Sequence, residues 1–251
     1  MSYSHAVVVG VPNTIKSDNK KSIATDALRK QSEGLIETLR EAGVSVSEFC
    51  PANGSSVSNL FVGDAAVSLR RILPKCCRTI QECPEFVDGK AVVLEGGDVF
   101  FTGKEIFVGI RKHGTNFEGA KVVAKVFCDH AVIPIHMSDK AQSLKYYVSL
   151  VAPGILAIGT SKEAQNVLKV LEAETMLRYR IIPVEDDEGV NCILVNNRLI
   201  FHQNKAAAVS YLPGPLFAMS PEPYRAESQQ VIHAKHPHSY NSVYAQIMGR
   251  G

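Results

Sequence analysis

One arrangement of residues occurs twice in the chain, and it limits the possible folds more than any other feature. Two apolar runs, a turn and a helical pattern follow one another in DVFFTGKEIFVGIRKHGTNFEGAKVVAKVF (98–127) and again in YYVSLVAPGILAIGTSKEAQNVLKVLEAE (146–174). Gly109 and Gly159 occupy equivalent places, 50 residues apart. Self-similarity at this period indicates modules that each bury an apolar face against a neighbour. An ordinary α/β sheet with coincidental repetition is the alternative.

The remainder of the chain also alternates between strand and helix patterns. A third strand pair is predicted at 191–202, with Asn196-Asn197 as its hairpin turn. SNLFVGDAAVSL (58–69) and KAVVLEGG (90–97) are further strand candidates. The other predicted strands are 6–12, 44–49 and 131–137, and the predicted helices are 23–42, ended by Gly43, and 119–127.

Composition excludes several classes of protein. A chain of 251 residues, 45% of them hydrophobic, can bury one large core. The net charge of +2 provides no basic field for nucleic acid, and no apolar run approaches the roughly 20 residues of a membrane span. The first residues lack the pattern of a secretory signal, and the six cysteines have no regular metal spacing. We therefore expect a soluble cytoplasmic protein with reduced cysteines.

The most unusual local motif is a glycine pair between two carboxylates, Glu95-Gly96-Gly97-Asp98, flanked by strand patterns. Strand interiors disfavour both Gly and Asp, so the motif predicts a tight corner between strands. Glycine permits unusual dihedral angles and close backbone approach there. Asp98 is expected to hold the turn by hydrogen bonds, which leaves Glu95 as the carboxylate available to a site.

The motifs LEGGDVFFTGKEIFVGI, TN-x-x-GA, LKYYVSLVAPGILAIGTSKEAQNVLKVLE and NCILVNNRLIFH resemble the dimethylarginine dimethylaminohydrolases of the pentein superfamily. The resemblance is dense over 90–202 and thinner over 5–67. It implies an α/β propeller of ββαβ modules around a pseudo-fivefold axis. The propeller is expected to be incomplete, because too few residues separate Asp64 from Glu95 for a full blade. Residues 1–204 would form the pentein domain, and 205–251 a divergent, poorly ordered segment in which only 227–234 is a candidate for regular structure.

The resemblance also implies an activity that needs no metal or cofactor. The family hydrolyses N-omega-methylated arginine to citrulline and methylamine or dimethylamine, which influences nitric oxide signalling. A Cys thiolate attacks the guanidinium carbon, a His protonates the leaving amine, and carboxylates hold the planar guanidinium. The expected ligand is a small molecule of the methylarginine class, whereas oligomeric state stays open.

Several family roles transfer to residues of this chain. Glu95 matches the carboxylate that orients the catalytic His, with a turn-capping carboxylate as the alternative. Asp64 in FVGDAAV matches a substrate-binding acid, and Val11 fits a backbone contact or a core position. Arg111 and His113 lie where the family places a basic residue for the substrate carboxylate. The extra Gly114 shifts that register, so a solvated charge at a strand end is the alternative for these two.

Other positions depart from the family pattern. Ser143 stands in the position of the catalytic His and cannot act as a general acid near neutral pH, and no cysteine follows Cys192. The sequence therefore predicts an impaired member of a hydrolase family, either a true pseudoenzyme or a splice or gene-model variant. The alternative function is a catalytically inactive binder of arginine analogues or an interaction module. The His-rich tail (His233, His236, His238) is expected to be disordered rather than a metal site.

Overall fold

The repeated sequence pattern forms a repeated ββαβ module. The computed structural model describes residues 3–16, 25–56, 60, 82–185, 187–196, 198–201 and 246–249. In each complete module an antiparallel strand pair is followed by a helix and by a third strand, which runs parallel to the second. This topology buries one face of a three-stranded sheet against the module's helix.

Two of these modules are consecutive in sequence. The first contains β7 (Val99–Phe101), β8 (Glu105–Ile110), α4 (Phe117–Val126) and β9 (Ala131–His136). The second contains β10 (Val148–Ala152), β11 (Ile155–Gly159), α5 (Lys162–Glu174) and β12 (Arg180–Val184). They correspond element by element, so the repeat predicted from the sequence is confirmed.

A third module is assembled from both ends of the chain. It contains β1 (Tyr3–Val9), α1 (Thr25–Glu41) and β3 (Ser45–Phe49), which lies parallel to β1. Its antiparallel partner strand is β15 (Gln246–Gly249), which pairs with β1. The prediction that only 227–234 could be regular after residue 204 is therefore wrong at 246–249, because β1 provides a template for pairing. Residues 202–245, including 227–234 and the tail histidines, lie outside the described residues.

A hairpin lies between the second module and the third module, and it contacts both. It consists of β13 (Cys192–Val195) and β14 (Arg198–Phe201), and Asn196 turns it with a φ of 48°. The Asn196 side chain accepts a hydrogen bond from Tyr3 N at 2.6 Å and donates to the carbonyls of Tyr3 and Ala42. The predicted turn at Asn196 is confirmed. Two short strand pairs complete the sheets: β2 (Ile15–Lys16) with β4 (Ser55–Ser56), and β5 (Phe86–Val87) with β6 (Lys90–Ala91).

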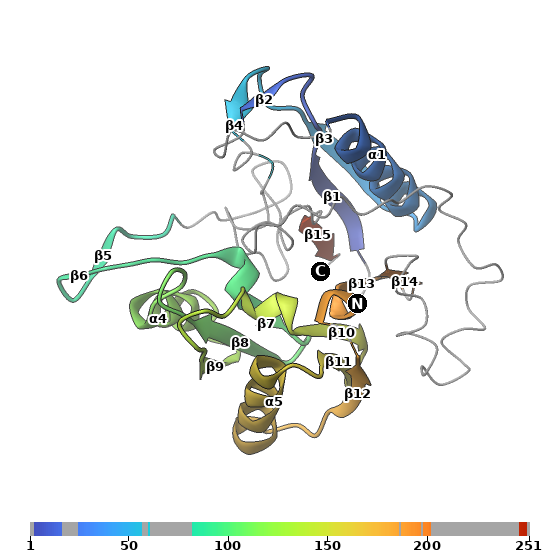
Figure 1. Ribbon diagram of the computed structural model, residues 1–251. Coiled ribbons are helices and arrows are strands. Elements are labelled where there is room, and N and C mark those ends of the chain that lie inside the picture. The colour runs from blue at the N-terminus through green and yellow to red at the C-terminus, as the bar shows by residue number, and fades with distance from the viewer. Residues whose placement is uncertain are drawn as a thin grey trace.

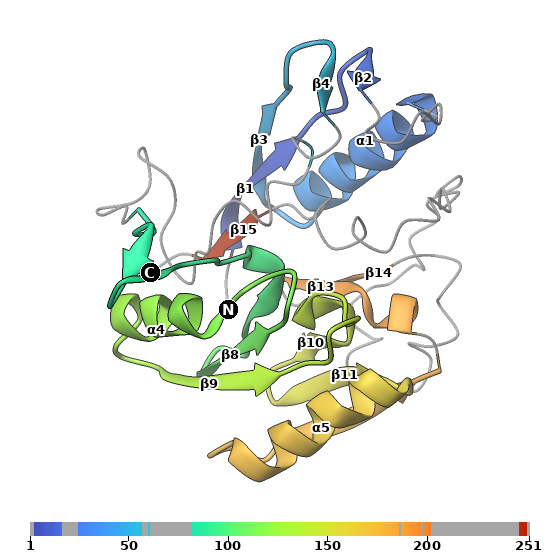
Figure 2. The same cartoon turned by 60° about the vertical axis from the view of Figure 1, so that its left-hand side comes forward.

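Short 3-10 helices precede the first strands of three units. They are η2 (Gly96–Asp98) before β7, η3 (Leu144–Tyr146) before β10 and η4 (Asp187–Val190) before β13. Figures 1 and 2 show β7, β10, β13 and β15 gathered around the middle of the molecule, with α1, α4 and α5 outside. The equivalent glycines make this arrangement possible, because a Cβ on Gly109 would lie 3.0 Å from Leu144 Cβ and one on Gly159 would lie 1.8 Å from Asp187 Oδ1. The lack of a side chain at Gly109 therefore allows η3 to pack closely, and the lack of one at Gly159 does the same for η4.

The two consecutive modules share a core and a buried polar contact. Phe107, Ile135, Leu144, Leu156 and Ile158 belong to one apolar cluster that spans both. Glu105, only 3% exposed, accepts hydrogen bonds from Tyr179 Oη at 2.6 Å and from Met176 N at 2.8 Å. Burial, together with the bond to Glu105, raises the pKa of Tyr179 to about 12. This network fixes the loop between α5 and β12 against the β7–β8 hairpin.

Most predicted elements agree with the structure, but one does not. The predicted strand 90–97 is limited to Lys90–Ala91, and 96–98 forms η2. Asp98 makes hydrogen bonds that favour this tight turn over an extended strand. Helix α4 begins at Phe117, earlier than predicted, because the Asn116 side chain caps it by accepting from Gly119 N at 2.9 Å. The strand candidate 58–69 lies outside the described residues except for Leu60.

No helix in the described part of the chain has the length and apolarity of a membrane span.

Candidate active site

Glu95 and Ser143 hold the same position in successive modules. Glu95 is the N-cap residue of η2, and Ser143 is the N-cap residue of η3. Each therefore immediately precedes the 3-10 helix that leads into the first strand of its module. The structure brings the two segments together, since Asp98 at the end of η2 accepts a hydrogen bond from Leu144 N at 3.1 Å.

Asp98 is the anchor of this corner. Its side chain is fully buried, and it accepts from Arg111 Nε at 3.0 Å, Thr115 N at 3.2 Å and Leu144 N at 3.1 Å. Glu95 N also donates to Thr115 Oγ1 at 2.9 Å. Asp98 holds the corner by hydrogen bonds, as predicted, and it also reaches the loop after β8 and the start of η3. The TN-x-x-GA motif was the sequence signal for the contribution of Thr115.

The guanidinium of Arg111 lies across both corner carboxylates. Its Nε contacts Asp98, its Nη2 pairs with Glu95 Oε2, and its Nη1 donates to the carbonyl of His113 at 3.1 Å. The Arg111 side chain is 9% exposed and that of Glu95 is 34% exposed. Gly114 provides the space, because a Cβ there would lie 2.4 Å from Arg111 Cζ. The extra glycine that disturbs the sequence register therefore accommodates this guanidinium.

The structure gives different outcomes for the other predicted site residues. The solvated strand-end alternative is wrong for Arg111, whose side chain is only 9% exposed and ion-paired. His113 is exposed and contributes its backbone carbonyl to the corner. Val11 lies just beyond β1 in the third module and is half-buried. Asp64 lies outside the described residues. The structure thus joins Glu95, Arg111 and the Ser143 segment, and the substrate-binding roles of all these residues stay predictions.

Among the cysteines that the structure describes, Cys192 packs against a buried apolar cluster, and its surroundings disfavour a reactive thiol. It lies at the start of β13, with its Sγ 2.9 Å from Ser149 Oγ. Burial raises the pKa of the Cys192 thiol to about 11, although the contact with Ser149 opposes that shift. Cys50, Cys83 and Cys128 are exposed. Because the thiolate is the nucleophile, Cys192 is a structural cysteine at neutral pH.

We expect Cys192 to resist alkylation in the folded protein. At pH 8 a thiol of pKa about 11 is roughly 0.1% thiolate, roughly two hundredfold less than an ordinary exposed cysteine. Timed iodoacetamide labelling with peptide mass spectrometry should modify Cys50, Cys83 and Cys128 first. Cys192 should react at a comparable rate only in guanidinium chloride. Labelling of Cys192 as fast as Cys128 in the folded chain would contradict this assignment.

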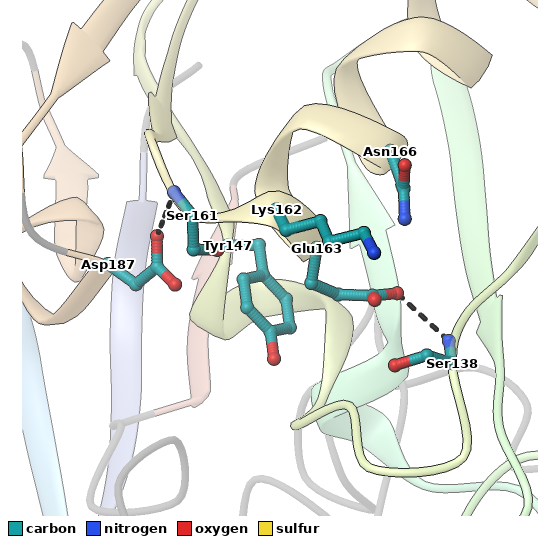
Figure 3. Close-up of a pocket in the computed structure, with 7 residues that line it drawn as sticks. All are labelled: Ser138, Tyr147, Ser161, Lys162, Glu163, Asn166 and Asp187. Carbon is teal, nitrogen blue, oxygen red and sulfur yellow. Dashed lines mark hydrogen bonds between the residues drawn. The ribbon is translucent and has the colours of Figure 1, made fainter.

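A cavity with several polar side chains in its lining lies beside η3. It has a volume of about 530 Å³ and is lined by Ser138, Tyr147, Ser161, Lys162, Glu163, Asn166 and Asp187 (Figure 3). Glu163 accepts from Ser138 N at 2.9 Å, and Asp187 lies 3.5 Å from Ser161 N. Burial raises the pKa of Tyr147, and the nearby carboxylates raise it further. Within the described ranges, no three side chains of His, Cys, Asp or Glu are grouped so as to hold a metal ion.

Comparison with known proteins agrees with this architecture. No protein-family model matches the sequence. The chain is 26% identical to the human protein DDAH2 over 219 residues, which are 76% of this chain and 74% of that protein. The bovine protein of the same name is 25% identical over an equal span.

Solved structures show the same fold. A DDAH from Pseudomonas aeruginosa, a cysteine-to-serine variant complexed with citrulline, superposes with a TM-score of 0.60 at 16% identity. The alignment covers 88% of this chain and 90% of that one. A dimethylarginine dimethylaminohydrolase variant, as an adduct with S-methyl-L-thiocitrulline, has a TM-score of 0.59 at 18% identity, over 82% and 87% of the two chains.

The repeated ββαβ modules and these structural neighbours define the fold as the pentein fold. An amidinotransferase from Microseira wollei shares it, with a TM-score of 0.51 at 12% identity over 83% and 85% of the two chains. Among proteins with this fold, the DDAH2 proteins are similar to this chain in sequence over 76% of its length. The chain therefore has the fold of the dimethylarginine dimethylaminohydrolases and is similar in sequence to the DDAH2 proteins.

Proposed function

We propose that this chain belongs to the methylarginine-hydrolysing branch of the superfamily and that its own turnover is impaired. The family reaction converts N-omega-methylated arginine to citrulline and an amine. The observation that carries the proposal is the position of the Arg111 guanidinium between Glu95 and Asp98. A corner that holds one planar guanidinium has the geometry and charge to hold another, because carboxylates and guanidinium groups match in shape.

The impairment is proposed from the groups that surround this corner. A hydroxyl at Ser143 cannot donate a proton to a leaving amine near neutral pH, whereas an imidazole can. Arg111 already neutralises Glu95, so Glu95 has less capacity to orient a catalytic base. The thiol of Cys192, with a pKa of about 11, is a weak nucleophile.

A second candidate is a binder of arginine analogues that performs no chemistry. The internal ion pair favours it, because the guanidinium of a ligand can replace that of Arg111 at Glu95 by an exchange of ion pairs alone. One structural neighbour, a DDAH, is solved with citrulline, and another, an arginine dihydrolase, is solved with its substrate. These two structures support a ligand of the arginine-analogue class for this chain. The two candidates share a ligand and differ in turnover.

Two measurements on the purified 251-residue chain test the proposal. Calorimetric titration with asymmetric dimethylarginine should detect weak binding that weakens further as salt rises, since salt screens exposed charge pairs. Replacement Glu95→Gln or Asp64→Asn should reduce it. Long incubations should release citrulline slowly in proportion to protein under the first candidate and not at all under the second. Absence of binding to any methylarginine would overturn both, and turnover at ordinary enzyme rates would show that the impairment is wrong.

A further inference from the structure

The third strand of each module lies at an outer edge of its sheet. β3, β9 and β12 are terminal in their sheets, and within the described residues no strand pairs with their outer sides. Figure 1 shows all three lying away from the central strands. An open edge exposes backbone N–H and C=O groups that can pair with another strand.

Two of these edges carry a proline at the same position. Pro134 of β9 pairs with Val108, and Pro183 of β12 pairs with Ile158. Met137 N donates to Ile110 O and Arg180 N donates to Gly154 O, both at 2.9 Å, so these two residues face inward. Because backbone groups alternate along a strand, Pro134 and Pro183 occupy outward-facing positions. Each proline removes an outward N–H and blocks pairing at that edge.

The edge of β3 has no such block. Phe49 O accepts from Gly10 N at 2.9 Å, so Phe49 and Ser47 face β1, and Val46 and Glu48 direct their backbone groups outward. Glu48 pairs with buried Val8 and, like the two prolines, occupies an outward-facing position of its edge strand. Unlike proline, Glu48 keeps its N–H. The strand is also accessible, since Ser45, Ser47 and Glu48 are exposed and Phe49 is 63% exposed.

We propose that β3 is a self-association surface on which the β3 strand of a second copy of this chain pairs in antiparallel orientation. The pairing joins two modules into one sheet across a twofold axis. Val46 of each copy lies opposite Glu48 of the other and exchanges two backbone hydrogen bonds with it. Ser47 lies opposite Ser47 on the axis, as a pair that is not hydrogen-bonded.

The charge pattern of β3 selects this partner and this register. Ser45-Val46-Ser47-Glu48-Phe49 has a single charged side chain. A register centred on Glu48 would place two carboxylates directly opposite each other, which destabilises a strand pair. Centring on Ser47 places each Glu48 opposite an uncharged Val46 and each Phe49 opposite Ser45. The strand is therefore its own complement, and twofold pairing of identical surfaces is the commonest form of self-association.

The size of the surface sets the expected strength. A five-residue strand pair buries less than the roughly 1,200–2,000 Å² typical of stable interfaces. The association is therefore weak and depends on concentration. Sedimentation velocity over about a hundredfold concentration range should show the average mass rising from 27.3 kDa toward twice that value.

The matched variants are Glu48→Pro and Glu48→Gln. Glu48→Pro installs the block that Pro134 and Pro183 provide in the other modules, so it should remain monomeric at every concentration. Glu48→Gln keeps the N–H and should associate at least as strongly as the unaltered chain. A monomeric unaltered chain near 1 mM, or undiminished association of a folded Glu48→Pro variant, would overturn the proposal.

A cross-linking measurement decides the matter even if Glu48→Pro fails to fold. Opposed residues of a pair that is not hydrogen-bonded have Cα atoms about 4.5 Å apart, within the range of a disulfide. Ser47→Cys should therefore form an intermolecular disulfide between its two copies on mild oxidation, whereas Ser45→Cys should not. Peptide mapping separates this bond from those of exposed Cys50, Cys83 and Cys128. Equal yields from the two variants would reject the Ser47-centred register and the proposal with it.

Discussion

Replacement of Asp98 by alanine is expected to lower the free energy of unfolding by roughly 3–5 kcal/mol, the usual cost of removing one partner of a buried ion pair. The carboxylate is fully buried and accepts from Arg111, Thr115 N and Leu144 N. Its removal takes away one of the two carboxylates that pair with Arg111, whose side chain is 9% exposed, and leaves two backbone N–H groups without this acceptor. Urea denaturation followed by circular dichroism measures the loss, since the chain has no tryptophan for fluorescence.

Glu95→Ala is the matched control for this prediction. Glu95 pairs with the same arginine, but its side chain is 34% exposed and Asp98 remains to neutralise Arg111. Its replacement should therefore cost under about 1 kcal/mol, as for other ion pairs near the surface. Equal losses for the two variants would mean that Asp98 is not the structural anchor of the corner.

The contrast between these carboxylates explains what the Glu95-Gly96-Gly97-Asp98 motif does in the fold. Four residues turn the chain into β7, tie the loop after β8 to the start of η3 and leave one carboxylate partly exposed. Ser143 occupies the equivalent position of the next module without a carboxylate. Equivalent positions of the two modules therefore carry different side chains near the middle of the molecule. The identity of these side chains determines what chemistry the site can perform.

The local parts of this arrangement could be predicted from the sequence because their signals are local. The strand pairs, the helix after each pair and the turn at Asn196 follow from periodicity and turn residues. The equivalence of Gly109 and Gly159 was also visible, and the structure gives it a reason, since each glycine admits the next 3-10 helix.

The non-local parts could not be predicted in the same way. β15 pairs with β1 across almost the whole chain, and a strand of only four residues gives no local signal of that partner. The guanidinium of Arg111 reaches back 13 and 16 residues to Asp98 and Glu95. In the sequence pattern Gly114 is an insertion that shifts the register. In the folded chain its lack of a side chain leaves room for the Arg111 guanidinium. Tertiary packing determines these contacts.

Ser143→His alone is expected to leave the rate of citrulline release from dimethylarginine indistinguishable from that of the unaltered chain. A histidine at this position restores a proton donor but no nucleophile. At pH 7 a thiol with a pKa of about 11 is only roughly 0.01% thiolate, so Cys192 cannot supply one. Arg111 also remains paired with Glu95, the carboxylate that would have to orient the new imidazole. Groups that act as one catalytic unit contribute little when the unit stays incomplete.

Mass-spectrometric detection of citrulline tests this with the sensitivity that near-background rates need. Calorimetric titration of both chains with dimethylarginine is the control, because unchanged affinity shows that the ligand still reaches the corner. A rise of about a hundredfold or more on Ser143→His would contradict the prediction, since general acid catalysis of that size requires a working nucleophile. Cys192→Ser and Cys128→Ser in the Ser143→His background would then identify it. Loss of the gained activity with Cys192→Ser would show that β13 supplies a reactive thiolate despite the burial that raises its pKa.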